Sequence, residues 1–304
     1  MLPDILSIPA VLTRKKERAE EIEREGFRVF TDIDEVLAVD HDAIIISSGK
    51  EGYYETLSRL HAGGERIVSE TTLLSLSDEE LDKVSSFSGL VMEQYQFTPL
   101  FSSVLKVLSS LEEKPDQLYL SGLHNHHSAS MARRILASGH HMPEEVSSIT
   151  FPSRIIKTGT RKGLDLSGEV ESYERSVRMM KLDGALFIHD FSSNQYHSYL
   201  MEKRFEIRCQ DMIITECGVS TVDGSGYPVF TPFQFHRDDR VGNGTLALSH
   251  VSLGDRTVFV NPYYPLNMND DEIAMAMMIE LFDKGNDLYP FSEGVMDARI
   301  GKLL

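Results

Sequence analysis

Residues 8–49 read IPAVLTRKKERAEEIEREGFRVFTDIDEVLAVDHDAIIISSG, and this stretch decides the fold. A short apolar run at 8–12 is followed by a charged helical segment and then by the strand-like FRVF at 27–30. A short helix, the apolar strand AIIIS at 43–47, another helix and the strand RIVSE at 66–70 come next. Strands that alternate with helices in this way predict a parallel sheet with crossover helices.

The usual start of such a domain does not precede this stretch. Ahead of Ile8 there is no strand with a glycine-rich turn, which is the element that holds a pyrophosphate in dinucleotide-binding folds. Without a first strand we expect the central position of the sheet to be vacant and its apolar edges to be exposed. Two explanations stay open: residues upstream of Met1 supply the strand, or the protein has lost it.

Composition excludes several classes of protein. A chain of 304 residues suggests about two domains, and 41% hydrophobic with 25% charged residues is typical of a globular protein. The net charge of −17 disfavours nucleic acid and anionic membrane as partners. No apolar run approaches the roughly 18 residues of a membrane helix. Cys209 and Cys217 alone form no disulfide framework, which favours a reducing cytoplasm.

The remainder of the chain predicts a second domain of a different kind. After the apolar strand GLVMEQ at 89–94, helices are expected over 97–111 and 128–139. From about 147 to 262, strands and turns without long helices predict a mostly antiparallel sheet. The expected fold class is therefore α/β plus α+β. It comprises a Rossmann-like domain at 1–93, truncated at its start, and a domain at 94–304 for substrate binding and oligomerisation.

The order of these segments resembles the glucose–fructose oxidoreductase / inositol dehydrogenase (Gfo/Idh/MocA) family over nearly the whole chain. The segments that carry the resemblance are RKKERAEEIEREGFRVFTDIDEVLAVDHDAIII, IVSETTL, MEQYQFTPLF and NPYYPLNMNDDEIAMAMMIELFDKGNDLYPFSEGVMDARI. The resemblance implies an NAD(P)-dependent oxidoreductase that acts on a sugar, a cyclitol or a related hydroxyl or carbonyl compound. It also implies a homo-oligomer that pairs through the antiparallel sheet.

Two departures from the family pattern support a different hypothesis. The family's G-x-G-x-x-G is missing, and its Glu-Lys-Pro motif is Glu70-Thr71-Thr72 here. In the family that Lys lies beside the nicotinamide and helps proton transfer. The alternative function is therefore a non-catalytic sugar-binding or scaffold homologue that has lost turnover and uses no cofactor.

The cofactor prediction starts from the residues that follow the apolar run at 8–12. Thr13 occupies the position where dinucleotide domains place an acidic residue on the adenosine ribose. Arg14 follows, and a guanidinium can donate two parallel hydrogen bonds to phosphate oxygens, so NADP is expected in preference to NAD. The other interpretation is that a basic run simply begins a solvated helix. The predicted cofactor contacts are Thr13, Arg14, Ser47, Ser48 and Glu70.

A histidine cluster at 124–127 provides the catalytic prediction. The resemblance implies that His127 acts as general acid or base on a substrate hydroxyl, a task that suits an imidazole with its ordinary pKa of about 6.5. A helix cap or a core histidine is the alternative. Tyr95 is expected to position the substrate or to belong to the core. The predicted substrate contacts are Gln96, His124, Asp190 and Gln195, although polar positions on a sheet surface would explain the last two equally well.

The number of histidines raises the question of a metal site. Residues 124–141 hold five of them, but they have neither HExxH spacing nor cysteine partners. We therefore expect no metal.

Overall fold

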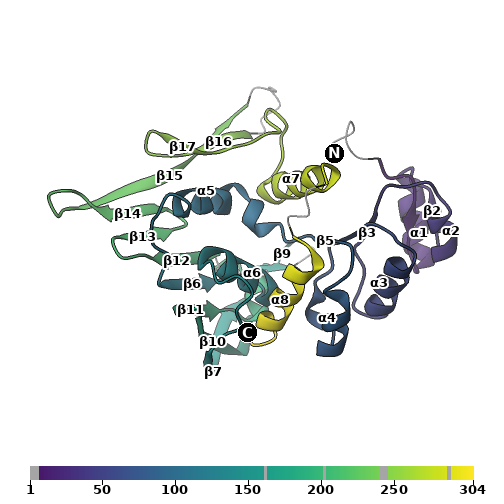
Figure 1. Ribbon diagram of the computed structural model, residues 1–304, viewed down its shortest axis with the longest axis horizontal. Coiled ribbons are helices and arrows are strands. Elements are labelled where there is room, and N and C mark those ends of the chain that lie inside the picture. The colour runs from purple at the N-terminus through teal and green to yellow at the C-terminus, as the bar shows by residue number, and fades with distance from the viewer. Residues whose placement is uncertain (1–6, 161–162, 201–202, 240–245, 286–288) are drawn as a thin grey trace.

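The computed structural model describes residues 7–160, 163–200, 203–239, 246–285 and 289–304. In its first part, strands and helices alternate as the sequence predicts (Figure 1). The paired strands of this part run parallel. Its elements are β1 (Val11–Leu12), α1 (Lys16–Arg24), β2 (Val29–Phe30), α2 (Ile33–Leu37), β3 (Ile44–Ile46), α3 (Tyr53–Ala62), β4 (Ile67–Ser69), α4 (Asp78–Val84) and β5 (Gly89–Val91).

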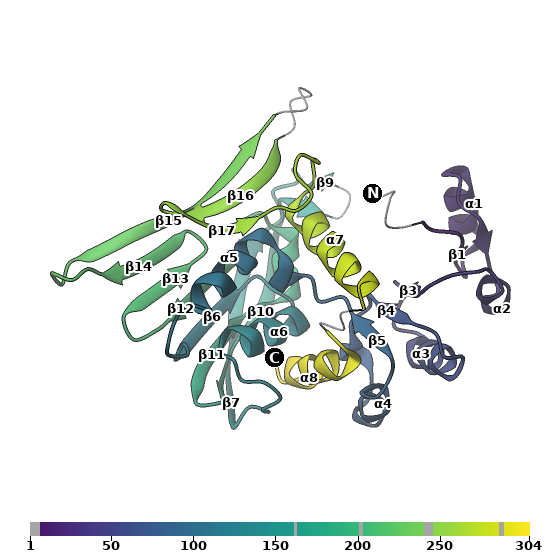
Figure 2. The same ribbon diagram turned by 45° about the horizontal axis from the view of Figure 1, so that its top comes forward.

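These parallel strands form two separate sheets. One contains β1 and β2, and the other contains β3, β4 and β5 in that order. Figure 2 shows β1 and β2 set apart from β3. Across the described ranges no strand lies between β1 and β3, and Leu12 and Ile45 are 36% and 46% exposed. The described part of the chain therefore has the vacant central position that the sequence leads us to expect.

The second part is built on a ten-stranded sheet in the order β17-β16-β15-β14-β13-β12-β6-β11-β10-β7. Strands β6 and β11 pair in parallel and the other neighbours pair antiparallel, which confirms the predicted fold class. The elements are α5 (Pro99–Leu108), β6 (Gln117–Ser121), α6 (Asn125–Ile135), β7 (Glu145–Ile156), β10 (Val170–Leu182), β11 (Ala185–Asp190), β12 (Arg204–Arg208), β13 (Met212–Thr215), β14 (Gly218–Val222), β15 (Pro228–Asp238), β16 (Ala247–Leu253) and β17 (Arg256–Val260). A separate two-stranded sheet contains β8 (Gly159–Thr160) and β9 (Gly163–Leu164).

Some boundaries differ from those that the sequence predicts. Within the region predicted to hold strands and turns, a 3-10 helix, η3 (Ser193–His197), comes before the short strand β12. A capping box between Ser192 and Gln195 begins η3, because each residue's side chain bonds the other's backbone N–H. Helix α6 starts at Asn125, three residues before the predicted start at 128.

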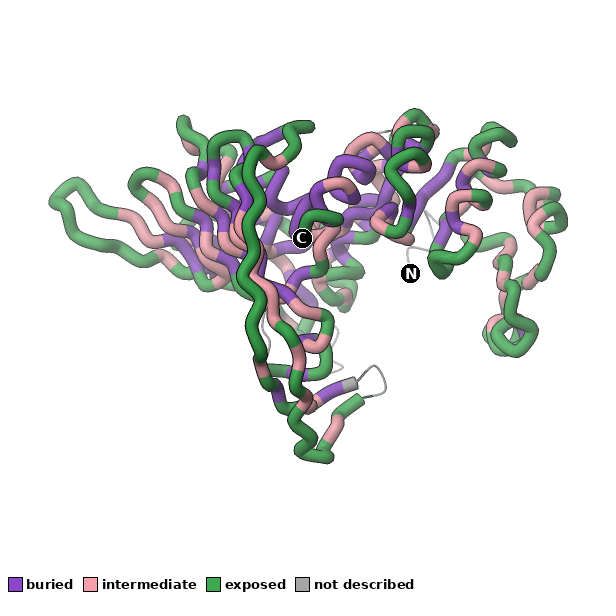
Figure 3. The backbone as a smooth tube through the Cα atoms, turned by 90° about the horizontal axis from the view of Figure 1, so that it is seen from below, coloured by how far each residue is buried: buried purple, intermediate pink, exposed green. Residues whose placement is uncertain are grey.

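Two hydrophobic cores lie where helices meet the sheets (Figure 3). The larger core joins one face of the ten-stranded sheet to α5 and α6, with Phe101, Leu118 and Phe187 among its members. The smaller core joins β4 and α3 to two C-terminal helices, α7 (Asp270–Asp283) and α8 (Phe291–Gly301). Residues from both ends of the chain therefore stabilise the smaller core.

The C-terminal segment also covers the outer edge of β5. The backbone N–H of Val91 donates to the carbonyl of Tyr289 at 3.0 Å, and Leu90 forms a bridge with Pro290. Helix α8 then packs on the same strand, and a Cβ atom added at Gly294 would lie only 2.6 Å from Cγ2 of Val91. This close approach requires glycine at position 294. No helix of the described residues is long and apolar enough to cross a membrane.

Candidate functional site

Polar side chains follow all three strands of the β3–β4–β5 sheet. Ser47 comes directly after β3, Glu70 directly after β4, and Glu93 two residues after β5. The carboxyl ends of parallel strands lie at one edge of a sheet, which is where open α/β sheets bind ligands. The hydroxyl of Ser47 donates to Oε2 of Glu70 at 2.9 Å, so two of the predicted cofactor residues are in contact.

Thr71 occupies the position where the family that the sequence resembles carries its Lys. Its hydroxyl donates to the carbonyl of Ser48 at 2.9 Å and accepts the backbone N–H of the same residue at 2.9 Å. A threonine hydroxyl does not titrate near neutral pH, and both of these bonds are to backbone. Thr71 therefore holds the turn after β3 in place and supplies no acid or base.

Thr13 and Arg14 follow β1 at the same edge of the split sheet. A guanidinium nitrogen of Arg14 donates to the hydroxyl of Thr56 at 3.4 Å and lies beside Gly52, the N-cap residue of α3. No side-chain bond caps α3. These contacts connect Arg14 to α3 across the vacant position of the sheet, whereas Ser47 and Glu70 form a pair of their own.

His127 and Tyr95, the two predicted catalytic residues, lie side by side. Their ring centroids are 4.3 Å apart. Nδ1 of His127 lies 2.8 Å from Oε2 of Glu93, whose side chain is 4% exposed. The ammonium group of Lys203 lies 4.6 Å from the centroid of the Tyr95 ring. The first turn of α6 thus places an imidazole between a buried carboxylate and an aromatic ring.

Burial determines how this pair carries protons. It raises the pKa of Glu93 to about 7 and, with Lys203 as a further cause, lowers the pKa of His127 to about 3. The imidazole is therefore neutral near pH 7, whereas the Glu93 carboxyl takes up and releases its proton in that range. When Glu93 is ionised it accepts the Nδ1–H of His127, which leaves the lone pair on Nε2. With a pKa of about 3 the imidazole is itself a weak base, so a proton taken at Nε2 has to be passed from Nδ1 to Glu93, whose pKa of about 7 lets it hold a proton near neutral pH.

A third group adjoins the pair. The ligand atoms of Glu93, His126 and His127 lie within 4.8 Å of one another, and the rings of His126 and His127 have centroids 3.9 Å apart. One carboxylate and two imidazoles form a donor set that suits zinc. The sequence prediction of no metal therefore needs a direct test.

The predicted substrate residues lie in different surroundings. Gln96 and Gln195 are buried, and the Nε2 atoms of both lack a partner among the described residues. Oε1 of Gln195 accepts the backbone N–H of Ser192 at 3.1 Å. His124 is exposed at the start of α6, with its ring 4.5 Å from that of Tyr196. Of this set, His124 and Gln96 lie next to the catalytic pair in the chain and in space.

Asp190 lies on the opposite face of the large sheet. Side chains alternate along a strand, so Asp190 on β11 points away from the face on which Phe187 and His189 are buried. It accepts hydrogen bonds from Nε of Arg175 at 2.8 Å and from the Tyr119 hydroxyl at 3.0 Å. The structure therefore does not bring Asp190 together with His127.

Three residues of the site were not among the sequence predictions. Glu93 did carry a signal, because it follows an apolar strand and precedes Tyr95. Lys203 and Asp271 line a hollow of about 170 Å³ beside Tyr95. They come from the start of β12 and from α7, and no local pattern connects them with the histidine cluster.

No protein-family model matches the chain, and no curated protein sequence matches it. Solved structures do share its architecture. Levoglucosan dehydrogenase in its apo form aligns with a TM-score of 0.62 at 15% identity, covering 99% of this chain and 89% of that one. An oxidoreductase from Agrobacterium radiobacter, in complex with NAD⁺, L-tartaric acid and magnesium, aligns with 0.57 at 13% identity over 99% and 89%.

A third solved structure extends the comparison. The UDP-N-acetylglucosamine 3-dehydrogenase of Acidithiobacillus ferrooxidans aligns with a TM-score of 0.58 at 16% identity, covering 97% of this chain and 86% of that one. Identities this low establish the fold alone. The chain therefore has the fold of these oxidoreductases, which is consistent with its resemblance to the Gfo/Idh/MocA family.

Proposed function

We propose that the protein is an NAD(P)-dependent oxidoreductase of the Gfo/Idh/MocA type, with a hydroxyl or carbonyl group of a sugar, a cyclitol or a related compound as its substrate. The observation that carries this proposal is the buried pair of His127 and Glu93 under the Tyr95 ring. The pair lies at the carboxyl edge of the β3–β4–β5 sheet, which is the usual ligand side of such folds. The likeness to solved dehydrogenases supports it.

The chemistry of the exposed residues fits two parts of a dinucleotide. Ser47 and Glu70 offer partners for ribose hydroxyls. Thr13 and the guanidinium of Arg14 offer donors for a 2′-phosphate, so we propose NADP in preference to NAD. The turn between β3 and α3 holds Gly49 and Gly52, but no turn of the described segments has the G-x-G-x-x-G spacing, so a pyrophosphate contact is not part of this proposal.

The chain's own residues manage the proton. A bound nicotinamide would supply hydride transfer. Nε2 of His127 takes the proton of the substrate hydroxyl, while ionised Glu93 holds Nδ1–H and so fixes the tautomer. Tyr95 covers the imidazole and keeps water from it. Because Thr71 does not titrate near neutral pH, His127 is the proposed acid or base in place of the family's Lys.

Nucleotide binding tests the cofactor part of the proposal. We expect NADPH to raise the melting temperature of the protein by mass action, and NADH to raise it less. Arg14→Gln should remove this difference, whereas Lys16→Gln, the same charge change two residues away, should keep it. A cooperative melt with no shift from either nucleotide would contradict cofactor binding.

One observation favours the alternative, a non-catalytic sugar-binding or scaffold protein. The position of the family's Lys is taken by Thr71, whose hydroxyl is fully engaged with the backbone of Ser48. Under this alternative a sugar would bind without nucleotide, and no NADPH would be formed or consumed. Calorimetry with polyols in the absence of nucleotide, together with an absorbance assay for NADPH, separates the two functions.

We also propose that the protein self-associates through the large sheet. The face opposite the buried Phe187 carries exposed apolar side chains on three strands, a kind of patch that commonly forms interfaces. They are Ile149, Phe151, Leu186 and Phe230. Sedimentation velocity should show a homo-oligomer, and Ile149→Lys should weaken it. A monomer at all concentrations would contradict this proposal.

A further inference from the structure

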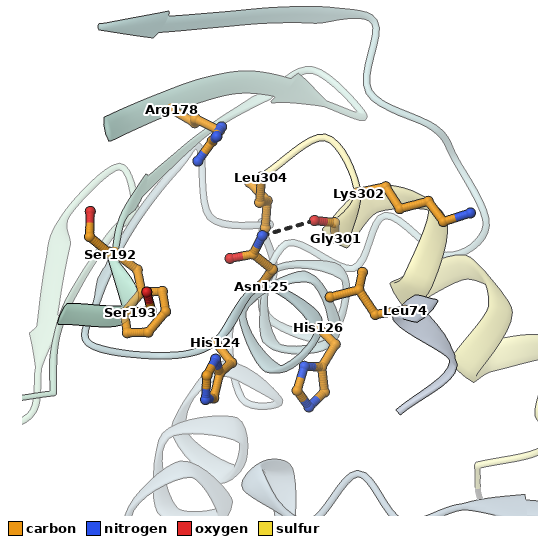
Figure 4. A pocket seen from close by; sticks show the side chains of 11 residues that line it. Leu74, His124, Asn125, His126, Arg178, Ser192, Ser193, Gly301, Lys302 and Leu304 are labelled. Atoms are coloured by element: carbon orange, nitrogen blue, oxygen red, sulfur yellow. Dashed lines mark hydrogen bonds between the residues drawn. The ribbon is translucent and has the colours of Figure 1, made fainter. Parts of the chain in front are cut away.

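A cavity of about 430 Å³ lies between the start of α6, the end of α8 and the loop after β11. Figure 4 shows Arg178, Asn125 and Ser192 around it, whereas the side chain of Lys302 points away from Arg178. Arg178 comes from β10 and Lys302 directly follows α8. Its volume falls in the range of about 300–1,000 Å³ that small-molecule sites occupy.

The cavity gathers positive charge in a chain whose net charge is −17. Lys302 already has a partner, since its ammonium group donates to Oδ1 of Asp78 at 2.7 Å. Arg178 is half-buried and has no acceptor or carboxylate partner among the described residues. A guanidinium in partly desolvated surroundings is stabilised by an anion. The free charge therefore indicates an anionic ligand.

Hydrogen-bond donors also reach the cavity from other directions. Helix α6 has eleven residues, and no side-chain bond caps the N–H groups of its first turn. The side chain of Asn125 donates to the carbonyl of Gly301 at 3.1 Å, which fixes α6 relative to α8. Ser193 lines another wall, while the hydroxyl of Ser192 already donates to the carbonyl of Glu174 at 3.4 Å. The guanidinium of Arg178 and the N–H groups at the start of α6 approach from different directions, which suits the tetrahedral oxygens of a phosphate.

We propose that this cavity binds the phosphate group of a phosphorylated sugar or cyclitol, with Arg178 as the cationic contact. The sugar part of this inference rests on the proposed function. His126 lines the cavity, and its ring centroid lies 3.9 Å from that of His127. A phosphate held here therefore lies one histidine away from the proton-transfer pair, within reach of the rest of a sugar phosphate.

Calorimetry without nucleotide tests the cavity directly. The probes are inorganic phosphate, glucose 6-phosphate and glucose, at constant ionic strength set with chloride. We expect both phosphates to bind the native protein more tightly than glucose does. Arg178→Gln should weaken phosphate about tenfold or more, because a hydrogen bond to a charged group is lost. Arg134→Gln, an exposed charge change on α6, is the matched control.

The other outcomes overturn the inference. Equal phosphate affinity in Arg178→Gln and Arg134→Gln would put the anion elsewhere, and no phosphate binding to the native protein would remove the site. If Arg178→Gln does not fold, Arg178→Lys replaces it, with weaker phosphate binding expected because a lysine cannot form the two parallel bonds of a guanidinium. If phosphate binds but NADPH does not raise the melting temperature, the oxidoreductase proposal is refuted and the phosphate site stands. If NADPH raises the melting temperature but phosphate does not bind, only the phosphate site is refuted.

Discussion

Nδ1 of His127 lies 2.8 Å from Oε2 of Glu93, across 34 positions of sequence. Glu93 follows β5 of the parallel sheet, and His127 belongs to the first turn of α6 in the second domain. The contact therefore joins the two parts of the molecule at the point where the polar ends of β3, β4 and β5 meet the histidine cluster. A ligand at this junction would contact both parts.

Replacing Glu93 tests whether it orients the imidazole. Glu93→Gln keeps the shape of the side chain but removes the charge that stabilises the Nδ1–H tautomer. Once a substrate is found, we expect kcat to fall by about 10² to 10⁴, the range for losing acid–base assistance, with KM little changed. Glu79→Gln, an exposed carboxylate on α4, should leave kcat unchanged. An unchanged kcat in Glu93→Gln would contradict the assignment.

Local signals predict the helices of this chain well. Ser77 and Asn269 precede α4 and α7, and they form capping boxes with Glu80 and Glu272, respectively. These caps are encoded within four residues, so no tertiary contact is needed to recognise them. The 13-residue strand β10 is hard to recognise from the sequence, because most of its residues are polar and it lacks the regular alternation of apolar and polar residues. Most of its side chains are at least partly exposed.

The sequence predicts the residues of the site that can be recognised within one stretch of the chain, but not the contacts between distant stretches. His127 and Tyr95 were expected together on the basis of the resemblance, and the structure brings them together. The partnership of His127 with Glu93 depends on packing between domains, which no sequence spacing encodes. The sequence does not tell on which face of the large sheet Asp190 lies, because alternation along a strand fixes the face only once it is known which side the helices cover.

His189 predicts how stability depends on pH. Burial, with Arg178 as a further cause, lowers the pKa of His189 from 6.5 to about 4, while the bond to the carbonyl of Leu123 and the charge of Asp190 oppose the shift. Between about pH 4 and pH 6.5, the imidazole of His189 is protonated in the unfolded chain and neutral in the folded protein. The free energy of unfolding should therefore decrease as pH falls from about 6.5 to 4, by roughly 3 kcal/mol in total.

Urea unfolding at pH 7.5 and at pH 5 measures this effect. His189→Asn keeps a donor for the carbonyl of Leu123, which lies 3.1 Å from Nε2 of His189, and it should reduce the pH dependence. His197→Asn, at an exposed position, provides the control. An identical pH dependence in His189→Asn and the native protein would show that other groups cause it.

Arg133 anchors α6 to α8 through a buried ion pair. One guanidinium nitrogen lies 2.7 Å from Oδ1 of Asp297, and the side chains of both residues are 5% exposed. Arg133→Met should lower the free energy of unfolding by about 3–5 kcal/mol, because the Asp297 carboxylate is left without its cation. Arg134→Met, at the exposed neighbouring position, should change it little. A small effect of Arg133→Met in urea unfolding would contradict a structural role for the pair.

Gly294 lies where α8 packs against β5 of the parallel sheet. An alanine Cβ there would lie 2.6 Å from Cγ2 of Val91, closer than side chains tolerate. Gly294→Ala should therefore cost about 1–3 kcal/mol of stability through overpacking. Gly224→Ala, where no atom lies within 4 Å of the added Cβ, is the matched control. Equal melting temperatures of the two variants would show that α8 shifts to accommodate the methyl group.

Chelation distinguishes an acid–base pair from a metal centre at Glu93, His126 and His127. A divalent ion would take the lone pair of His127 and the charge of Glu93, so the imidazole could no longer accept a proton. Because these two groups already bond each other at 2.8 Å, we expect EDTA to leave the melting temperature unchanged and zinc to raise it little. His126→Asn should behave like the native protein in both measurements. A large stabilisation by zinc that His126→Asn abolishes would instead identify His126 as a ligand and the cluster as a metal centre, and the proton acceptor would then have to be a metal-bound water.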